Sequence, residues 1–358
     1  MICGLRVMLK YLNAHRFAHA RLLLLVIAVP VLFLTSACGL IGTKKKIEVP
    51  QLLTPMAEAG KDRLFQEVNR FSTVTSIHGK VDIQFEDTSF ATSGVADQYR
   101  LVDGDITLQR PGKIYLIIQF LVVDIAQMTS DGEQFRVAVL KGDDKYKRFV
   151  KGTNNAVYQK LEPEPATSKP PKNQKRGEKE TISALSNLRP QHLTDAFMVR
   201  PIDTSGTMFY AQSEFFQEEP DTRRNAQKGS RVMRPYYVLD EFLPAQAGQA
   251  KLLRRFWFDR VSGIRLARIQ FFDDAGSLLT DVAYSNEKQV GSGQTASLPS
   301  RLEITRPQDR YKLNITYQDV SSVQLNRTYS PKAFVLENTW GLEVVDLDAI
   351  NKKVTANK

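Results

Sequence analysis

The sequence predicts a mainly β protein of the α+β class, in which antiparallel strands form a strongly curved sheet or a barrel. In many short segments apolar and polar residues alternate with a period of two, as they do in half-buried strands. Turn residues such as Asp103-Gly104 and Ser262-Gly263 separate many of these segments. Two helices are expected as well, and helical spacing predicts the first of them. Such a series of short antiparallel strands is typical of curved sheets and barrels.

Residues 1–37 are predicted to be a secretory signal peptide. The apolar run at 22–34 has 13 residues, fewer than the roughly 20 that a helix needs to cross a bilayer core. Four basic residues and no acidic residue precede it, as in the basic region of a signal peptide. The small residues Thr35, Ser36 and Ala37 follow it, and Cys38 comes next. We therefore expect cleavage before Cys38 and no spanning helix.

The residues before Cys38 resemble the bacterial lipobox, in which a small residue precedes a cysteine that then carries diacylglycerol. Thr35 stands where that pattern usually has leucine, and Leu34 lies one residue earlier. The resemblance implies that Cys38 is lipidated and anchors the chain to a membrane. The alternative is an ordinary signal peptide, with Cys38 as an incidental thiol. Because the sequence has two cysteines and Cys3 lies in the removed segment, the mature chain has no internal disulfide.

The mature chain is moderately basic. Removal of the first 37 residues leaves 45 Lys and Arg against 39 Asp and Glu, a net charge of +6. This excess does not indicate nucleic acid as a partner, and it fits weak attraction to anionic headgroups. Residues 38–54 have few core-forming side chains and are predicted to be a tether. We expect residues 55–345 to form a single β domain and residues 346–358 a C-terminal tail.

The elements of this domain follow from local patterns. Thr54-Pro55 can begin a helix, and Leu64, Val68 and Phe71 recur at helical spacing, so we expect a helix at 55–71. A second helix is expected at 190–197. Strands are expected at 81–85, 95–100, 105–110, 113–120, 135–139, 146–150, 207–213, 235–239, 252–258, 264–272, 279–284, 301–305 and 311–317.

Two polar segments interrupt the strands. Residues 162–180 contain four prolines, nine charged residues and no large apolar side chain, so we expect a disordered surface insertion. A second polar loop is expected at 217–231.

The sequence contains no pattern that indicates an enzyme, a cofactor or a metal. The histidines of the mature chain, His78 and His192, are far apart and have no other ligand at metal-binding spacing. Phosphate-binding and dinucleotide-binding glycine loops, the Gly-x-Ser-x-Gly motif and the Ser-x-x-Lys motif are absent from the sequence. We therefore expect a binding or structural protein without a cofactor.

One stretch, GDITLQRPGKIYLIIQFLVVDIAQMTSDGEQFRVAV at residues 104–139, is more specific. A strand ends in Arg110-Pro111, two strands joined by a turn follow, and Ser130-Asp131-Gly132 precedes another strand. With the preceding helix and the strands at 256–276 and 298–324, this order resembles the lipoprotein-carrier family of Gram-negative bacteria. That family includes the periplasmic carrier LolA and the outer-membrane receptor LolB. The resemblance covers residues 60–139 and 250–340.

This resemblance implies an incomplete, strongly curved antiparallel β-barrel with a helix or helices across its mouth, around an apolar cavity for acyl chains. In the carrier, the arginine of the Arg-Pro pair helps to hold a lid over the cavity, which implies this role for Arg110, followed by Pro111. The alternative is an arginine that bonds only its strand-end neighbours. By period two, the cavity residues would be Val81, Ile83, Phe85, Ile106 and Leu108.

In the receptor, a leucine on a protruding loop inserts toward the membrane. The matching turn makes Leu121 or Val122 the candidate, and a buried strand is the alternative for these residues. Because the chain has its own lipidation site, it is more similar to the receptor than to the soluble carrier. Gly39 stands where the inner-membrane retention signal has aspartate, which favours the outer membrane.

The function expected from the sequence is that of a lipid-anchored outer-membrane protein that faces the periplasm. It would bind a lipid or an acylated ligand noncovalently and help to deliver it, with a periplasmic carrier or an envelope complex as a partner. The alternative is a structural β-rich lipoprotein that docks on an envelope complex and has no ligand cavity.

Overall fold

The computed structural model describes residues 49–88, 97–98, 101–142, 144, 147–154, 156, 158, 189–245, 248–261 and 263–356. The signal peptide, Cys38, the tether up to residue 48 and the insertion at 162–180 lie outside the described residues. The chain divides into two compact units, Met1–Pro50 and Gln51–Lys358, and all described helices and strands belong to the second.

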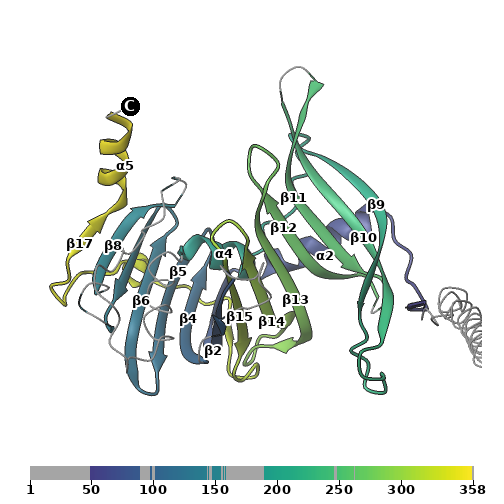
Figure 1. Cartoon of the computed structure of the whole chain (residues 1–358), viewed down its shortest axis with the longest axis horizontal. Coiled ribbons are helices and arrows are strands. Elements are labelled where there is room, and N and C mark those ends of the chain that lie inside the picture. The colour runs from purple at the N-terminus through teal and green to yellow at the C-terminus, as the bar shows by residue number, and fades with distance from the viewer. Residues whose placement is uncertain are drawn as a thin grey trace, which may run out of the picture. The chain divides into compact units, whose positions relative to one another are not determined.

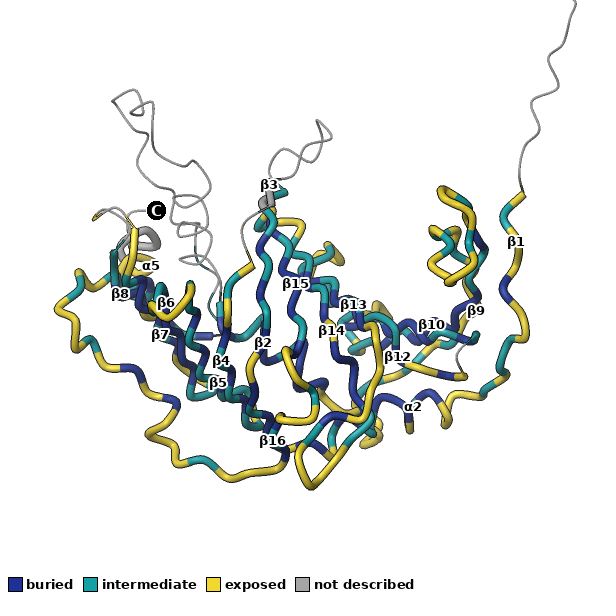
Figure 2. Tube along the Cα trace, turned by 90° about the horizontal axis from the view of Figure 1, so that it is seen from below, coloured by how far each residue is buried: buried dark blue, intermediate teal, exposed yellow. Residues whose placement is uncertain are grey.

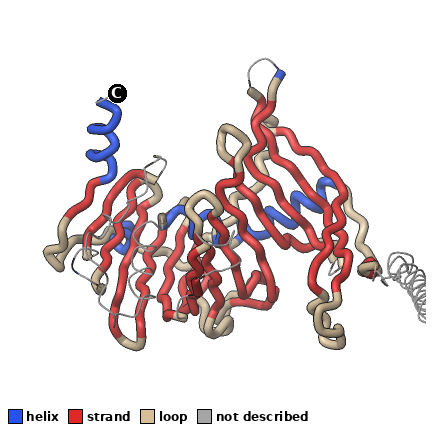
Figure 3. The backbone as a smooth tube through the Cα atoms, viewed as in Figure 1, coloured by secondary structure: helices blue, strands red, loops and turns tan. Residues whose placement is uncertain are grey.

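The strands of this unit form one sheet of 17 strands (Figure 3). In chain order they are β1 (Gln51–Leu52), β2 (Ser76–Asp87), β3 (Asp97–Gln98), β4 (Val102–Gln109), β5 (Lys113–Phe120), β6 (Val123–Asp131), β7 (Gln134–Val139), β8 (Arg148–Thr153), β9 (Phe209–Pro220), β10 (Arg231–Pro244), β11 (Ala250–Asp259), β12 (Arg265–Phe272), β13 (Leu278–Val290), β14 (Ala296–Arg306), β15 (Tyr311–Tyr317), β16 (Gln324–Leu325) and β17 (Val344–Asp346).

Each predicted strand overlaps one of these strands, and β5 has the predicted bounds. The helices are α2 (Lys61–Asn69), α4 (Pro190–Phe197) and α5 (Leu347–Ala356), with short 3₁₀ helices η2 (Arg70–Thr73) and η6 (Pro331–Phe334). The helix predicted at 190–197 is confirmed as α4. Helix α5 occupies most of the segment that we expected to be a C-terminal tail.

Across the sheet, the strands follow the order β9-β10-β11-β12-β13-β14-β15-β2-β4-β5-β6-β7-β8-β17 (Figure 1). All these pairs are antiparallel except β17–β8, which is parallel. Long antiparallel runs of this kind twist because of the handedness of each strand. The first part of the sequence pairs with the last part where β2 meets β15.

The sheet is curved and open (Figure 1), so the expected strong curvature is confirmed, whereas the strands do not close into a barrel. Among the described residues, β9 pairs only with β10, and β17 pairs only with β8. Closure would require β9 to pair with β17, and these two strands are not paired in the described part of the chain. The mainly β, antiparallel class predicted from the sequence is confirmed.

Helices α2 and α4 pack on the same face of the sheet, which we call the helix face. Alternate residues of a strand point to opposite faces, and burial follows this rule. On β10, Tyr237 and Leu239 belong to the main core on the helix face, whereas Tyr236 and Val238 belong to a smaller cluster on the opposite face. Buried residues continue along the whole row of strands (Figure 2). One core therefore spans the sheet.

The predicted start of the first helix was wrong. The helix begins at Lys61, with Gly60 as its N-cap, and not at Pro55. The backbone before Gly60 bonds to the sheet instead, because Leu53 N donates to Met233 O at 2.9 Å and Ala57 N donates to Arg260 O at 2.8 Å. These long-range partners outweigh the local capping signal of Thr54-Pro55.

The polar loop predicted at 217–231 was too long. Strand β9 continues to Pro220, and β10 begins at Arg231, so the loop is limited to residues 221–230. The polar residues at 217–220 remain in the strand because the side chains of Glu218 and Glu219 pair with Arg231 and Arg234 of β10.

Candidate functional site

The helix face carries a segment that crosses the sheet without joining it. We call residues 189–203, which comprise α4 and the residues that follow it, the strap. Six apolar residues of the strap are buried in the main core, namely Leu193, Ala196, Phe197, Met198, Val199 and Ile202. The strap contains the helix that the sequence predicted at 190–197.

Arg110 holds the middle of the strap. It lies at the end of β4, and its guanidinium donates four hydrogen bonds to backbone carbonyls. Two of them belong to the strap, Met198 O at 3.1 Å and Val199 O at 3.0 Å. The other two, Phe71 O and Val74 O, belong to the connection between α2 and β2 and lie at 2.9 Å. Arg110 therefore bonds its neighbours and the strap together.

The charge of Arg110 is compensated only by peptide dipoles among the described residues, where it forms no ion pair with a carboxylate. Burial of the guanidinium lowers the pKa of Arg110. Hydrogen bonds from a charged donor are worth about 1.5–3 kcal/mol. Because carbonyls of a released strap can accept hydrogen bonds from water instead, this attachment is reversible in principle.

Arg254 on β11 holds the other end of the strap. Its Nη1 donates to Arg200 O at 3.0 Å, and its Nη2 donates to Pro201 O at 3.4 Å. Unlike Arg110, it also forms an ion pair, with Glu241 of β10 (Nη2 to Oε1, 2.7 Å). The two side chains are 7% and 4% exposed, so this is a buried pair.

Tyr210 extends this network toward the end of the strap. Its hydroxyl donates to Glu241 Oε1 at 2.9 Å and accepts from the backbone N–H of Asp203 at 3.1 Å. Burial and the charge of Glu241 raise the pKa of Tyr210. The hydroxyl therefore stays protonated and can donate to the carboxylate.

Three further side chains fix the strap. Tyr284 Oη donates to Ala196 O at 2.8 Å, and Asn69 Oδ1 accepts from Ile202 N at 2.8 Å. His192 Nδ1 lies 2.8 Å from Tyr311 Oη. Burial, and then the charges of Arg306 and Arg189, keep the pKa of His192 well below its usual value. The strap is thus attached through side chains rather than through a backbone ladder.

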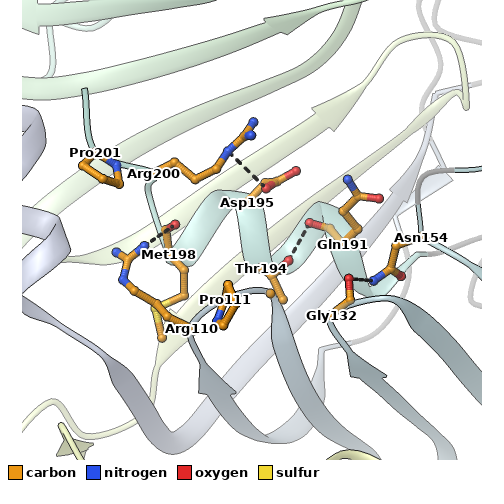
Figure 4. A pocket seen from close by; sticks show the side chains of 11 residues that line it. Arg110, Pro111, Gly132, Asn154, Gln191, Thr194, Asp195, Met198, Arg200 and Pro201 are labelled. Atoms are coloured by element: carbon orange, nitrogen blue, oxygen red, sulfur yellow. Dashed lines mark hydrogen bonds and ion pairs between the residues drawn. The ribbon is translucent and has the colours of Figure 1, made fainter. Parts of the chain in front are cut away.

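A cavity of about 380 Å³ lies where α4 faces the turns after β4 and β6 (Figure 4). Arg110 and Pro111 line one side, and Thr194, Asp195 and Met198 line the other. Burial raises the pKa of Asp195, and Arg200 is 4.0 Å from this carboxylate. The lining mixes apolar and polar groups. This cavity lies beside the strap, next to the Arg110 contact.

The residues predicted to line an acyl cavity lie together in the main core. Val81, Ile106 and Leu108 are fully buried, and Ile83 and Phe85 are 5% and 4% exposed. They share this core with the apolar residues of the strap. The cavity beside Arg110 is lined by none of these five residues. In this structure, apolar side chains therefore surround them.

The predicted membrane loop is a two-residue turn between β5 and β6. Leu121 and Val122 are 75% and 89% exposed, and Val123 beside them is 45% exposed. Leu101 is 57% exposed, and the pairing of Asp103 with Gln119 places it at the same end of the strands. The alternative of a buried strand at this turn does not apply.

A second cavity, of about 690 Å³, lies on the opposite face over β9 to β14. Tyr236 and Trp257 line it, together with half-buried ion pairs that link Arg234 to Glu219 and Asp259, and Arg268 to Asp281. These charged groups are partnered with one another. The sequence analysis did not anticipate this cavity.

Arg254 and Glu241 were not among the predicted site residues, although the sequence contains a signal for them. By the alternation of a strand, Arg254 points to the same face as the buried residues Phe256 and Phe258. Glu241 likewise points to the same face as Tyr237 and Leu239. A charged residue on a strand face that is otherwise apolar indicates that its charge is paired with a buried partner. The partner itself could not be identified, because it lies on the neighbouring strand.

The described residues contain no group of metal-binding side chains and no helix that is long and apolar enough to span a membrane. His78, one of the two mature histidines, bonds to Thr107 Oγ1 at 2.9 Å, and His192 lies in the strap. Neither is placed near a second histidine.

No family model and no curated protein matches the chain. Among solved structures, it is similar to a LolA superfamily protein from Nitrosomonas europaea, at 13% identity and a TM-score of 0.40, covering 78% of this chain and 99% of that chain. It is also similar to a DUF1329 family protein from Desulfovibrio piger, at 10% identity and a TM-score of 0.39, covering 76% and 95%. The family that the sequence resembles is thus among the similar structures.

Proposed function

We propose that this protein binds a lipid or an acylated ligand noncovalently on the helix face of its sheet and takes part in the delivery of that ligand. The strap would act as the lid. The observation that carries the proposal is the attachment of the strap, an apolar segment held by hydrogen bonds from side chains to its backbone. Displacement of the strap leaves the strand pairing intact and exposes the apolar residues beneath it.

Ligand binding would exchange one apolar partner of the helix face for another. With the strap closed, Leu193, Phe197 and Met198 cover the apolar helix face. An acyl chain could cover the same face, since burial of apolar area contributes about 25 cal/mol per Å² whichever molecule supplies it. The hydrogen bonds of Arg110 would set how readily the exchange occurs. Val81, Ile83, Phe85, Ile106 and Leu108 would then contact the ligand.

The decisive experiment is native mass spectrometry of the chain purified from cells as the Cys38→Ser form, which lacks the proposed covalent lipid. A copurified lipid or acylated peptide supports the proposal, and extraction should release it. The matched control is the same chain after delipidation and exposure to a fatty-acid probe. If no lipid is found and no probe binds, the proposed function is wrong.

A second candidate function is that of a structural module with a filled interior. The burial of the five predicted cavity residues in a packed core favours it. In that case the strap is a permanent part of the core, and its amides should exchange hydrogen as slowly as those of the central strands. Hydrogen exchange of the strap therefore discriminates between the two candidates.

The proposal includes anchoring of the chain at the outer membrane through Cys38, with the body facing the periplasm. Thioether attachment needs sulfur, so the Cys38→Ser chain should lose label from a metabolically supplied fatty acid. Retention of label in that chain would show that Cys38 is not the site.

The exposed turn at Leu121 and Val122 would contact the membrane during delivery. Two apolar side chains at the tip of a hairpin can enter the interface without any change in the sheet. We expect Leu121→Asp with Val122→Asp to reduce flotation of the Cys38→Ser chain with anionic vesicles. Val335→Asp, at an exposed valine elsewhere, is the control. Equal flotation of both variants would remove the turn from the proposal.

A further inference from the structure

The two edges of the sheet differ in how they are protected. At one edge, β17 is three residues long, and α5 follows it and is tied to β8 by the bond from Thr153 Oγ1 to Asp348 (2.9 Å). At the other edge, β9 is 12 residues long and, in the described part of the chain, pairs on one side only (Figure 1). Lys61 Nζ reaches the carbonyl of Tyr210, near the start of β9, at 3.4 Å.

The side chains of β9 do not have the features that normally protect an edge. Natural edge strands are usually short, or carry lysine or an internal proline that prevents pairing with another strand. Strand β9 has no lysine, and its proline is the last residue, Pro220. It exposes three phenylalanines instead, with 45% of Phe209, 46% of Phe215 and 41% of Phe216 accessible.

The carboxylates of β9 protect the edge less than free charges would, because each of them is paired with an arginine of the same chain. Glu214 pairs with Arg260 at 2.9 Å, Glu219 pairs with Arg234 at 3.1 Å, and Glu218 pairs with Arg231. These are the only charged residues of the strand. A second copy approaching this edge would therefore meet no unpaired carboxylate on β9.

We propose that the free edge of β9 pairs with β9 of a second copy of this chain, antiparallel, so that one sheet continues across a homodimer. Two-fold symmetry restricts the register of this pair. Directly opposite residues of an antiparallel pair point to the same face, so one residue of β9 must lie opposite its own copy, at the two-fold axis. With residue 214 at the axis, Glu214 lies opposite Glu214 of the other copy. With residue 216 at the axis, Glu214 lies opposite Glu218. With Phe215 at the axis, neither pair of carboxylates meets.

In the register with Phe215 at the axis, the exposed rings of Phe215 and Phe216 also contact the other copy. Phe215 lies beside its own copy on the opposite face, while Phe216 faces Glu214 of the other chain on the helix face. Gln212, whose amide donates to Ala59 O of its own chain at 3.0 Å, then faces Glu218, so a neutral side chain lies opposite this carboxylate. Aromatic and polar cross-strand pairs of this kind stabilise sheets. This inference is independent of the proposed lipid ligand, because it uses neither the strap nor the main core.

The test uses the full chain in its own membranes. Phe215→Cys should form a disulfide-linked homodimer on mild oxidation, because the two thiols meet at the axis. Phe209→Cys is the matched control, on the same face of the same strand and equally exposed, but far from its copy in this register. The parent chain, which contains only Cys3 and Cys38, gives the background.

A second measurement does not depend on the introduced cysteine. The detergent-solubilised chain should sediment as a dimer, and Phe215→Lys should sediment as a monomer, while Val335→Lys, at another exposed apolar residue, remains a dimer. Equal linkage of Phe215→Cys and Phe209→Cys, a monomeric parent chain, or linkage of Phe215→Cys to a different protein would each overturn the proposal.

Discussion

Arg110 and Arg254 hold the same strap, but they differ in what else they contact. Arg110 donates only to backbone carbonyls, on the strap and on the segment between α2 and β2. Arg254 donates to the strap and also forms a buried ion pair with Glu241. Loss of the strap would leave Arg254 with its carboxylate and would leave Arg110 with only two of its four acceptors.

The difference indicates which end of the strap can move. Near Arg254, the strap, the sheet and Tyr210 share one buried polar network. Separation of the strap from the sheet there would expose Arg254 and Glu241, and water would have to solvate both charges. Near Arg110, only hydrogen bonds to carbonyls and apolar contacts are lost. We therefore expect α4 and residues 198–199 to move away from the sheet, while residues 200–203 act as the fixed end.

The largest effect is expected from Arg254→Met. The variant leaves Glu241 buried without its cation, and breaking a buried pair in this way costs about 3–5 kcal/mol of unfolding free energy. Urea unfolding of the Cys38→Ser chain measures it. Arg255→Met is the control, because Arg255 is 34% exposed and pairs with Asp240 on the opposite face, which should cost at most about 1 kcal/mol. Equal losses in both variants would contradict the special role of Arg254.

A smaller effect is expected when the whole pair is replaced by Arg254→Met with Glu241→Leu. Apolar replacement of a buried ion pair is often neutral for stability, so the double variant should recover most of the loss. Its strap still lacks the two hydrogen bonds from Arg254. Faster hydrogen exchange at Ile202 and Asp203 with near-normal urea stability is the expected combination. A double variant as unstable as Arg254→Met would assign the loss to packing rather than to the unpaired charge.

Arg110→Leu should affect the strap more than the sheet. Removal of the two charged hydrogen bonds to the strap, each worth about 1.5–3 kcal/mol, weakens its closure, and the core strands lose no partner. Hydrogen exchange should accelerate at residues 193–199, and a fatty-acid probe should bind faster. Arg110→Lys, which keeps the charge but cannot reach all four carbonyls, should be intermediate. If strap exchange is unchanged in Arg110→Leu, apolar packing alone closes the strap.

The sequence predicted those elements whose pattern is local. Period two gave β5 and β15 with their observed bounds, and the helix predicted at 190–197 is α4. The proposed acyl residues were placed on one face by the same rule, and they do share one core. Local periodicity is informative here because each of these strands has one apolar face and one polar face.

The sequence failed where distant residues decide the structure. The start of α2 depends on Met233 and Arg260, which hold the backbone before it, and the length of β9 depends on arginines of β10. The fixed end of the strap depends on Arg254, whose partner Glu241 is 13 residues away on another strand. The sequence shows that these residues are charged, but it does not show the pairing of the strands that brings them together.

The smallest effect expected is a pH dependence at the α4 end of the strap. The pKa of His192 is lowered by burial and by the charges of Arg306 and Arg189, so the packed imidazole stays neutral. In a displaced strap the same imidazole takes up a proton below its ordinary pKa of about 6.5. The stability of closure is therefore constant above that pH and falls below it, by at most about 1.4 kcal/mol per pH unit.

This pH effect distinguishes the two ends, because His192 lies in α4 and contacts Tyr311, not the network of Arg254. Between about pH 6.5 and pH 5, hydrogen exchange corrected for its intrinsic pH dependence should increase at residues 193–199 and not at Ile202 and Asp203. His192→Gln can still bond to the Tyr311 hydroxyl but cannot titrate, so it should remove the pH dependence. An equal acid response at both ends would show that the strap does not open at the Arg110 end alone, and a response that persists in His192→Gln would show that His192 is not the group that titrates.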